Sequence, residues 1–405
     1  MKVAVIGGGA AGFFAAISCK THHPEASVSI IEKSTKTLAK VKVSGGGRCN
    51  VTNACEQQAD FLRHYPRGQK QLKKTFNYFN RQDTINWFEG RGVQLKAEPD
   101  GRMFPITDDS QTIIDCLRKE VEILGISILM KSSIIELMPQ SHGGFKLSFD
   151  STGEEHFDFV IIATGGNPKS TGYDWLRQLG HKIVEPVPSL FTFNIPEEKK
   201  LKALMGLAVP NVVVKIQGTK MVQKGPVLVT HWGLSGPAVL KLSAWGARQL
   251  FDMNYNFKAQ VNWTSGMNEE ELRKQVLSVS ERESKKKILN AKPIDIPNRL
   301  WDYLLERVDL DKGTIWAEVK KKDKNRLVNI LLNDEYAVEG KTTFKEEFVT
   351  CGGVDLSEVD FNTMQSRKLP GLFFAGEVLD IDGITGGFNF QAAWSTGFVA
   401  GKLGQ

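Results

Sequence analysis

Residues 2–21, "KVAVIGGGAAGFFAAISCKT", carry the clearest structural signal in the chain. The first five are apolar and rich in β-branched side chains, which is typical of a buried parallel strand. Three glycines with the spacing GxGxxG follow, and the alanine-rich segment behind them is predicted to be a helix. A second apolar strand over residues 27–32 ends on Glu32, which stands 23 residues after Gly9. Because strand, glycine turn, helix, strand and acid occur in this order, we predict an α/β dinucleotide-binding unit of the Rossmann type.

Each glycine of the turn has its own role in such a unit. Gly7 permits the tight turn, Gly9 lets a pyrophosphate approach the backbone, and Gly12 lets the helix pack on the strand. Glu32 is expected to accept hydrogen bonds from a ribose diol, and the helix N-terminus favours phosphate. The alternative is a glycine turn that holds no ligand. The acid by itself does not separate a nicotinamide dinucleotide from a flavin dinucleotide.

A second glycine-rich loop follows at residues 44–53, "SGGGRCNVTN". Three adjacent glycines permit very close approach of the backbone to a flat or anionic ligand. Arg48 is a candidate for a charge-assisted contact with phosphate, and an ordinary hairpin turn is the alternative interpretation. Cys49 has no second cysteine at a dithiol spacing, so we interpret it as a small, partly buried thiol, with a redox role as the alternative.

Beyond this loop the sequence predicts a nucleotide-binding fold that is interrupted. "FVIIATGG" (159–166) is expected to be a buried strand that ends at a glycine pair, and the composition changes after Pro186 and Pro188. Short alternating strands are expected over residues 190–264, which gives a β-rich module. Apolar residues at helical spacing predict helices over 70–92, 108–124, 268–290 and 298–332.

Within the β-rich module, "VTHWGLSGPAVLKLS" (229–243) is a glycine-bounded loop that leads into an apolar helix. His231 is a candidate proton shuttle because histidine titrates near neutral pH, and Ser235 follows it in the same loop. A serine-hydrolase interpretation fails because "GLSG" lacks the GxSxG spacing. A structural loop histidine stays open as the alternative.

The bulk composition fits a globular protein of more than one domain, with 405 residues, 41% hydrophobic and 24% charged. The net charge of +6 is partly concentrated in two basic runs, Lys285–Lys287 and residues 320–326. We interpret these as solvated faces of lysine-rich helices and expect no nucleic-acid partner, with nucleic-acid binding as the alternative. No apolar window suits a membrane span, and five cysteines without a CxxC pair favour a cytoplasmic setting. No metal site is expected.

The chain resembles the BaiN-like, YhiN-like or aminoacetone-oxidase-like family of FAD-dependent oxidoreductases. The resemblance covers essentially residues 1–405, and it rests on motifs that occur in the family order. These are "GGGAAG", "SGGGRCNVTN", "GRMFP", "ATGG", "THWGLSGPAVL", "TCGGV", "GLFFAGEVLDIDG" and "TGGFNFQAAWSTG". It implies a glutathione-reductase-like FAD-binding domain at 1–190 and 345–405. The insert at 191–344 is then β-barrel-like at 191–265 and 333–344 and helical at 266–332.

The same resemblance implies a set of FAD contacts from both ends of the chain. Asp380 is expected at the ribityl or pyrophosphate region, and the helix opened by Gly386 and Gly387 is expected to direct its N-terminal amides at the isoalloxazine. Of the residues around "TLAKVKVS", only Lys40 and Ser44 carry over from the family pattern. The predicted cofactor-binding residues are Gly7, Gly9, Ala10, Ala11, Gly12, Glu32, Lys33, Lys40, Ser44, Gly46, Gly47, Arg48, Cys49, Asn50, Ile134, Thr164, Gly165, Gly166, Gly376, Glu377, Asp380, Gly386, Gly387, Phe388 and Asn389.

The expected activity is hydride transfer between bound FAD and a small organic substrate. The chain has no second GxGxxG, so a dedicated nicotinamide-binding domain is not expected. NAD(P)H is instead expected to act as a transient electron donor that docks over the flavin. Two alternatives to this activity stay open. One is amine oxidation with oxygen as the electron acceptor, and the other is a non-enzymatic flavin-holding or RNA-associated protein.

Overall fold

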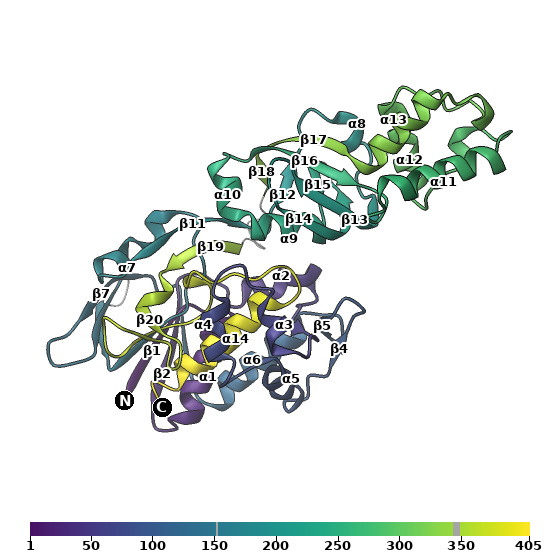
Figure 1. The fold of residues 1–405 in the computed structure, drawn as a ribbon. Coiled ribbons are helices and arrows are strands. Elements are labelled where there is room, and N and C mark those ends of the chain that lie inside the picture. The colour runs from purple at the N-terminus through teal and green to yellow at the C-terminus, as the bar shows by residue number, and fades with distance from the viewer. Residues whose placement is uncertain (151–152, 343–348) are drawn as a thin grey trace. The chain divides into compact units, whose positions relative to one another are not determined.

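The computed structural model describes residues 1–150, 153–342 and 349–405. The chain divides into two compact units, shown in Figure 1. Unit 1 joins residues 1–189 to the described C-terminal residues 349–405, and unit 2 is formed by residues 190–342. The predicted end of the insert, at residue 344, lies outside the described residues.

Unit 1 is built on a seven-stranded sheet whose centre is parallel. The strand order is β20-β21-β22-β10-β1-β2-β6, and every pair from β22 to β6 is parallel. This arrangement confirms the predicted α/β fold of the Rossmann type. The strands are β1 (Lys2–Ile6), β2 (Ser27–Glu32), β6 (Ser127–Met130), β10 (Phe159–Ile162), β20 (Val359–Asp360), β21 (Gln365–Ser366) and β22 (Leu372–Phe374).

Two helices from opposite ends of the chain pack against each other in unit 1. These are α1 (Ala10–His22) and α14 (Phe388–Gly401), which lie side by side in Figure 1. A β-carbon at Gly397 would lie 2.6 Å from the Ala11 carbonyl oxygen, and one at Gly401 would lie 2.4 Å from that of Ala15. The glycines therefore allow the two backbones to approach more closely than any side chain would permit.

Smaller elements surround this core. The helix predicted over 70–92 is interrupted, because Asn80 caps a new helix through a reciprocal pair of hydrogen bonds with Asp83. The helices are α2 (Ala39–Gly47), α3 (Gln58–Leu62), α4 (Gln69–Thr75), α5 (Arg81–Glu89), α6 (Gln111–Ile123) and α7 (Asp174–Gln178). The strands are β3 (Thr52–Asn53), β4 (Leu95–Ala97), β5 (Arg102–Pro105), β7 (Ile134–Pro139), β8 (Phe145–Phe149), β9 (Gly153–Phe157), β11 (Ile183–Ser189) and β19 (Val349–Val354).

Unit 2 contains an antiparallel sheet in the order β17-β16-β13-β14-β15-β12-β18. Its two edge strands follow each other in sequence through Gly340, so one stretch of chain joins both edges, as in a small barrel. The strands are β12 (Thr192–Asn194), β13 (Ala208–Ile216), β14 (Val222–Val229), β15 (Gly233–Ser235), β16 (Asn256–Asn262), β17 (Asp334–Glu339) and β18 (Lys341–Thr342). Helices α8 (Lys199–Lys202), α9 (Pro237–Trp245) and α10 (Ala247–Asp252) accompany them.

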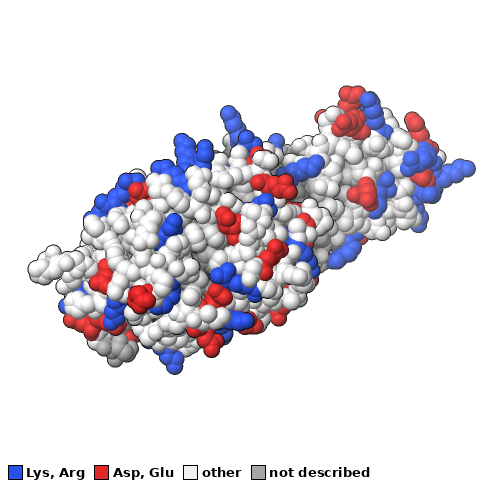
Figure 2. Space-filling view, turned by 90° about the horizontal axis from the view of Figure 1, so that it is seen from below, with Lys and Arg blue, Asp and Glu red and all other residues white. Residues whose placement is uncertain are grey.

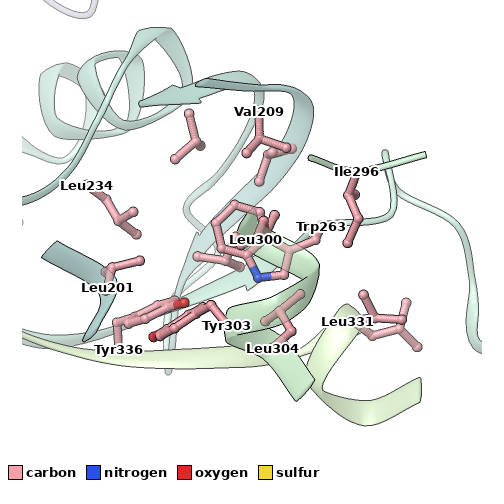
Figure 3. Packing of buried hydrophobic residues seen from close by; sticks show 14 of the residues in the cluster. Leu201, Val209, Leu234, Trp263, Ile296, Leu300, Tyr303, Leu304, Leu331 and Tyr336 are labelled. Atoms are coloured by element: carbon pink, nitrogen blue, oxygen red, sulfur yellow. The ribbon is translucent and has the colours of Figure 1, made fainter. Parts of the chain in front are cut away.

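The helical part of unit 2 comprises α11 (Glu269–Arg282), α12 (Asn298–Arg307) and α13 (Lys321–Leu332). The helix predicted over 298–332 ends at Arg307, because Asp309 adopts a left-handed backbone conformation with φ of +51°. Buried aromatic and aliphatic side chains join these helices to the sheet, with Trp263, Leu304 and Tyr336 among them (Figure 3). In the part of the chain that the structure describes, no helix has the length and apolar character to cross a membrane.

Candidate dinucleotide-binding site

The glycine turn between β1 and α1 has two kinds of glycine. A β-carbon at Gly12 would lie only 1.9 Å from the Gly7 carbonyl oxygen, so the packing of the helix on the strand requires a glycine there. A β-carbon at Gly9 would meet nothing within 4 Å. The protein's own packing therefore leaves open space at Gly9, which a close pyrophosphate requires. This turn fits the predicted dinucleotide.

Glu32 lies at the carboxyl end of β2, beside this turn. One carboxylate oxygen accepts a hydrogen bond from the Gly8 N–H at 2.8 Å, and the other accepts from the Ser34 N–H at 2.8 Å. Each oxygen keeps a second acceptor position, so the carboxylate can still bind ribose hydroxyls. Ile134 is half-buried near the same strand end, where the Ser132 N–H bonds to the Glu32 carbonyl at 3.0 Å. Lys33 is exposed next to Glu32.

A positively charged hollow of about 520 Å³ adjoins the glycine turn. The hollow lies beside the turn, because a β-carbon at Gly8 would lie 2.9 Å from the side-chain methyl of Thr37, which lines the hollow. Four cationic side chains line the hollow, which favours an anionic ligand such as phosphate. The lining residues are Lys36, Thr37, Ala39, Lys40, Lys42, Val43, Gln111, Ile114 and Arg118.

The second glycine loop is shaped by left-handed backbone geometry. Gly45, Gly46 and Gly47 all have positive φ values, and β-carbons at Gly46 and Gly47 would meet nothing within 4 Å. Ser44 departs from helical geometry at the start of this loop, and its hydroxyl donates to the Val41 carbonyl at 3.0 Å. The loop therefore leaves room for close approach of a ligand at two adjacent glycines.

Arg48 is engaged by the protein's own groups. Its guanidinium bonds to Glu98 at 2.6 Å and lies 4.0 Å from the Phe104 ring centroid. Glu98 also holds Arg102 of the "GRMFP" motif at 2.7 Å. Glu98 was not identified from the sequence, because the turn that brings it to Arg48 lies 50 residues further along the chain.

Cys49 is fully buried and has a φ of +60°. Burial raises the pKa of its thiol to about 12, so the thiol stays protonated at neutral pH. The structure shows no disulfide at Cys49. These features favour the interpretation of Cys49 as a buried, unreactive thiol.

The start of α14 is held by side chains from the segment after the second glycine loop. With its amide oriented to satisfy both neighbours, Asn50 accepts from the Gly387 N–H at 2.9 Å and donates to the Thr52 carbonyl at 3.0 Å. Asn53 donates to the Gly386 carbonyl at 3.0 Å. Tyr65 donates to the carbonyl of Phe388 at 2.7 Å. These contacts bring the predicted residues Asn50, Gly386, Gly387 and Phe388 together.

Asn389, the last of the predicted cofactor-binding residues, links the start of α14 to the loop before it. Its side-chain amide accepts from the Gly383 N–H at 2.8 Å and donates to the Gly383 carbonyl at 2.9 Å. The first amides of α14 have no partner within the helix, as at every helix N-terminus. The loop thus fixes where these amides point.

Glu377 connects three other predicted segments. It forms an ion pair with Lys40 at 2.6 Å, and its second oxygen accepts from the Thr350 N–H at 2.8 Å. A β-carbon at Gly166 would lie 2.4 Å from the Thr350 hydroxyl oxygen, so the "ATGG" segment runs directly past this group.

The remaining residues of these segments lie close by in the fold. Thr164 is exposed, and a β-carbon at Gly165 would meet nothing within 4 Å. Gly376 is buried, and Asp380 is half-buried, with its N–H donating to the Val354 carbonyl at 3.1 Å.

A buried ionic cluster in the loop before α14 was not identified from the sequence. Arg67 binds the fully buried carboxylate of Asp382 with two hydrogen bonds, and the Ser189 hydroxyl donates to the same carboxylate at 2.7 Å. Burial raises the pKa of Asp382 to about 6, although Arg67 and Ser189 lower it. Its only sequence signal is an aspartate between apolar residues in "LDIDGI".

The two predicted catalytic residues belong to unit 2. His231 is exposed, with its ring centroid 4.7 Å from that of Trp232. Ser235 is buried in β15 and accepts a hydrogen bond from the Thr192 hydroxyl at 3.0 Å. Within the described ranges no group of three or more His, Cys, Asp and Glu is arranged to hold a metal.

Comparison with known proteins adds the family relationship. A model of the HI0933-like protein Rossmann domain matches residues 1–403. The ribosomal RNA dihydrouridine synthase of Escherichia coli (strain K12) is 29% identical over 98% of this chain and 96% of its own length. The 3-dehydro-bile acid delta(4,6)-reductase of Clostridium scindens is 27% identical over 99% of this chain and 98% of its own length. The solved structure of a 3-ketosteroid-delta4-(5alpha)-dehydrogenase from Rhodococcus jostii RHA1 shares the fold, with a TM-score of 0.52 and 13% identity over 98% of this chain and 96% of that one.

Proposed function

The chain belongs to the HI0933-like protein Rossmann domain family and is an FAD-dependent oxidoreductase, and we propose that it saturates a carbon–carbon double bond conjugated to a carbonyl. The family resemblance predicted from the sequence is confirmed by this membership. In the proposed reaction the substrate gains a hydride at one carbon and a proton at the other. NAD(P)H is proposed as the source of the electrons.

The observation that supports this reaction is that two relatives with different substrates act on the same type of bond. Dihydrouridine differs from uridine by saturation of the C5–C6 bond, which is conjugated to the C4 carbonyl. A 3-dehydro-delta(4,6) bile acid carries double bonds conjugated to its C3 carbonyl. The names of these relatives thus describe one chemistry on a pyrimidine and on a steroid. The two relatives are only 27–29% identical to this chain. We therefore infer for this chain the reaction that they share rather than the substrate of either one.

The residues of unit 1 are proposed to hold FAD along its length. At the adenosine end, Glu32 would bind the ribose, with Lys33 and Ile134 beside it. Gly9 would accommodate the pyrophosphate because its backbone is open, and the cations of the neighbouring hollow would favour its negative charge. Gly165 and Asp380 would contact the central part.

The start of α14 is proposed to lie at the flavin ring, which supplies the hydride when FAD is bound. The positive end of a helix beside the pyrimidine carbonyl of the ring stabilises negative charge that develops there on reduction. Asn50 and Asn389 hold the helix start in place through their hydrogen bonds to Gly387 and Gly383. Their role would be to keep the first amides of α14 directed at the ring.

His231 is proposed to deliver the proton to the substrate. Its ring is exposed, so it can exchange a proton with solvent, as a general acid requires between turnovers. Ser235 is proposed to support the same loop through its contact with Thr192.

The proposed reaction is tested by anaerobic flavin reduction followed by turnover. Bleaching of the flavin by NADH or NADPH and reoxidation by a uracil compound or a 3-keto-4-ene steroid is the expected result. His231→Gln should lower turnover without changing FAD content, and His156→Gln, at an exposed histidine of unit 1, is the matched control. Bleaching by amines alone, with reoxidation by oxygen, would overturn the proposal in favour of amine oxidation.

A further inference from the structure

Two lysine-rich segments that are distant in sequence meet in the helical part of unit 2. The chain after α11 runs beside the segment before α13, and backbone hydrogen bonds join them. The Trp316 N–H donates to the Lys286 carbonyl at 3.0 Å, and the Ala317 N–H donates to the Ser284 carbonyl at 2.9 Å. The Lys324 ammonium also donates to the Ser280 hydroxyl at 2.6 Å. The two basic runs therefore form one surface, which we call the lysine cluster (residues 281–287 and 318–326).

The lysine cluster accounts for most of the net charge of the protein. It contains nine Lys and Arg against four Asp and Glu, a net charge of +5, whereas the whole chain carries +6. In Figure 2, blue side chains project at the helical end of unit 2, with a few red ones between them. The local potential there is positive, while the rest of the surface is nearly balanced.

Five lysines of the cluster are not used in ion pairs with the described carboxylates. Lys286 pairs with Glu283 at 2.8 Å, and Arg326 is within 3.5 Å of Asp323. Arg282 also pairs with Glu283, at 3.3 Å, and Lys324 is half-buried and donates to Ser280. The remaining five are exposed and form no such pair among residues the structure describes. They are Lys285, Lys287, Lys320, Lys321 and Lys322. Their charges are therefore available to a ligand from solution.

Two helix starts in this part of unit 2 differ in the charge that surrounds them. α11 begins with three glutamates in its first turn and with Asn268 in a capping box, as the helix dipole favours. α13 begins with Lys320, Lys321 and Lys322, has no side-chain cap, and has one acid, Asp323, in its first turn, so the net charge there is positive. Positive charge at the positive end of a helix is unfavourable. A cost of this kind is retained where the charges have another use.

We propose that the lysine cluster binds the phosphate backbone of RNA. An acidic protein surface is a poorer match, because lysine is depleted in protein interfaces and the cluster offers no aromatic anchor. A membrane surface is a poorer match, because the apolar residues of α13 (Leu327, Val328, Leu331, Leu332) are buried and cannot insert. The inference deepens the proposed reduction and rests on it for the reacting bond, since the uracil ring of RNA contains a double bond of that type. It takes up the alternative to our expectation that no nucleic acid is bound.

The test is binding of a fluorescent, uridine-containing RNA stem-loop to FAD-loaded protein, followed by anisotropy over a range of salt concentrations. The cluster variant is Lys285→Gln, Lys287→Gln, Lys320→Gln and Lys321→Gln. The control variant removes four exposed lysines elsewhere in unit 2, Lys199→Gln, Lys215→Gln, Lys220→Gln and Lys224→Gln, so the change in net charge is the same. We expect the cluster variant to bind at least about tenfold more weakly at physiological salt, with a log–log salt slope smaller by about three. The control variant should retain the affinity and slope of the parent.

Three outcomes would overturn the proposal. These are an equal loss in both variants, equal binding of a DNA hairpin of the same sequence, and cluster-dependent binding to phosphatidylserine vesicles rather than to RNA. Unchanged FAD content and melting temperature in both variants exclude a loss through misfolding. Because the measurement uses oxidised protein without a reductant, failure to bind RNA leaves the proposed reduction standing. Failure of the reductase assay likewise leaves the binding result standing.

Discussion

The helices α1 and α14 both begin at glycines and pack on each other, yet their N-termini differ in what surrounds them. At α1, Gly9 has open space beside it, although Glu32 bonds to Gly8 and Ala163 packs against Gly7 in the same turn. At α14, the preceding loop is bound by Asn50, Asn53, Tyr65 and the Arg67–Asp382 pair. One helix start is left open, and the other is fixed by the protein itself.

This difference indicates a division of labour along one long cofactor. A diphosphate brings its own charge and adapts to an open, positive turn. A flavin ring has to be placed precisely for hydride transfer, so the helix beside it needs rigid support. Changes at α1 should therefore separate into folding and ligand effects, whereas changes around α14 should first affect stability.

The largest effect is expected for Gly12→Val. The new side chain cannot fit, because even its β-carbon would lie 1.9 Å from the Gly7 carbonyl oxygen. We expect no folded, flavin-containing protein, as judged by circular dichroism and by the yellow colour of the purified sample. Gly9→Ala is the matched control, since its β-carbon meets no atom, and it should fold normally but bind FAD more weakly. Equal behaviour of the two variants would contradict the distinction drawn for the turn.

Asp382→Ala should cost about 3–5 kcal/mol of unfolding free energy, because it leaves the Arg67 guanidinium buried without its carboxylate. The double variant Arg67→Met, Asp382→Leu removes both charges, so it should lose clearly less unfolding free energy than Asp382→Ala does. Chemical denaturation of the three proteins checks this order. A single variant that unfolds like the parent would show that the loop before α14 is not held by this pair.

The same carboxylate should make stability depend on pH. Its pKa in the folded protein is raised by burial to about 6, so the folded state holds a proton that the unfolded state releases nearer pH 4. The stabilisation is present below about pH 4 and is lost as the pH rises through about 6. Relative to the parent, Asp382→Asn should remove a slope of up to about 1.4 kcal/mol per pH unit in this window. Parallel stability curves for the parent and the variant would refute this assignment.

Glu32→Ala should weaken FAD binding by about 1–3 kcal/mol, because the ribose hydroxyls lose their acceptor. Titration of the apoprotein with FAD measures the effect. Glu25→Ala, at an exposed glutamate between α1 and β2, is the control and should bind FAD as the parent does. If FMN bound as tightly as FAD to the parent, the role of Glu32 at the adenosine ribose would be wrong.

The sequence predicted the βαβ unit because all of its signals are local. Gly7, Gly12 and Glu32 lie within one short segment, and each is required by the backbone or by hydrogen bonding in that segment. The same holds for β13, where alternating apolar residues mark the strand directly. Local chemistry of this kind can be recognised without knowledge of the rest of the fold.

Pairings between distant segments could not be predicted in this way. Arg48, a predicted phosphate contact, forms an ion pair with Glu98, and nothing near either residue in the sequence indicates that pair. Arg67 and Asp382 are 315 residues apart and meet only because the sheet and α14 bring their loops together. The meeting of the two lysine runs likewise depends on hydrogen bonds between residues 284–286 and 316–317.

The packing of α14 on α1 has a consequence for the order of events during biosynthesis. Residues 10–22 leave the ribosome long before their partner, which begins at residue 388. At about 5–20 residues per second the separation means a wait of roughly 20–75 seconds. Unit 2, which is continuous in sequence, is fully synthesised within that interval and can fold first. The nascent helix α1 meanwhile exposes the surface that α14 will later cover. Loading of the flavin therefore waits for the synthesis of α14, and a nascent chain stalled before residue 388 is a natural client for chaperones.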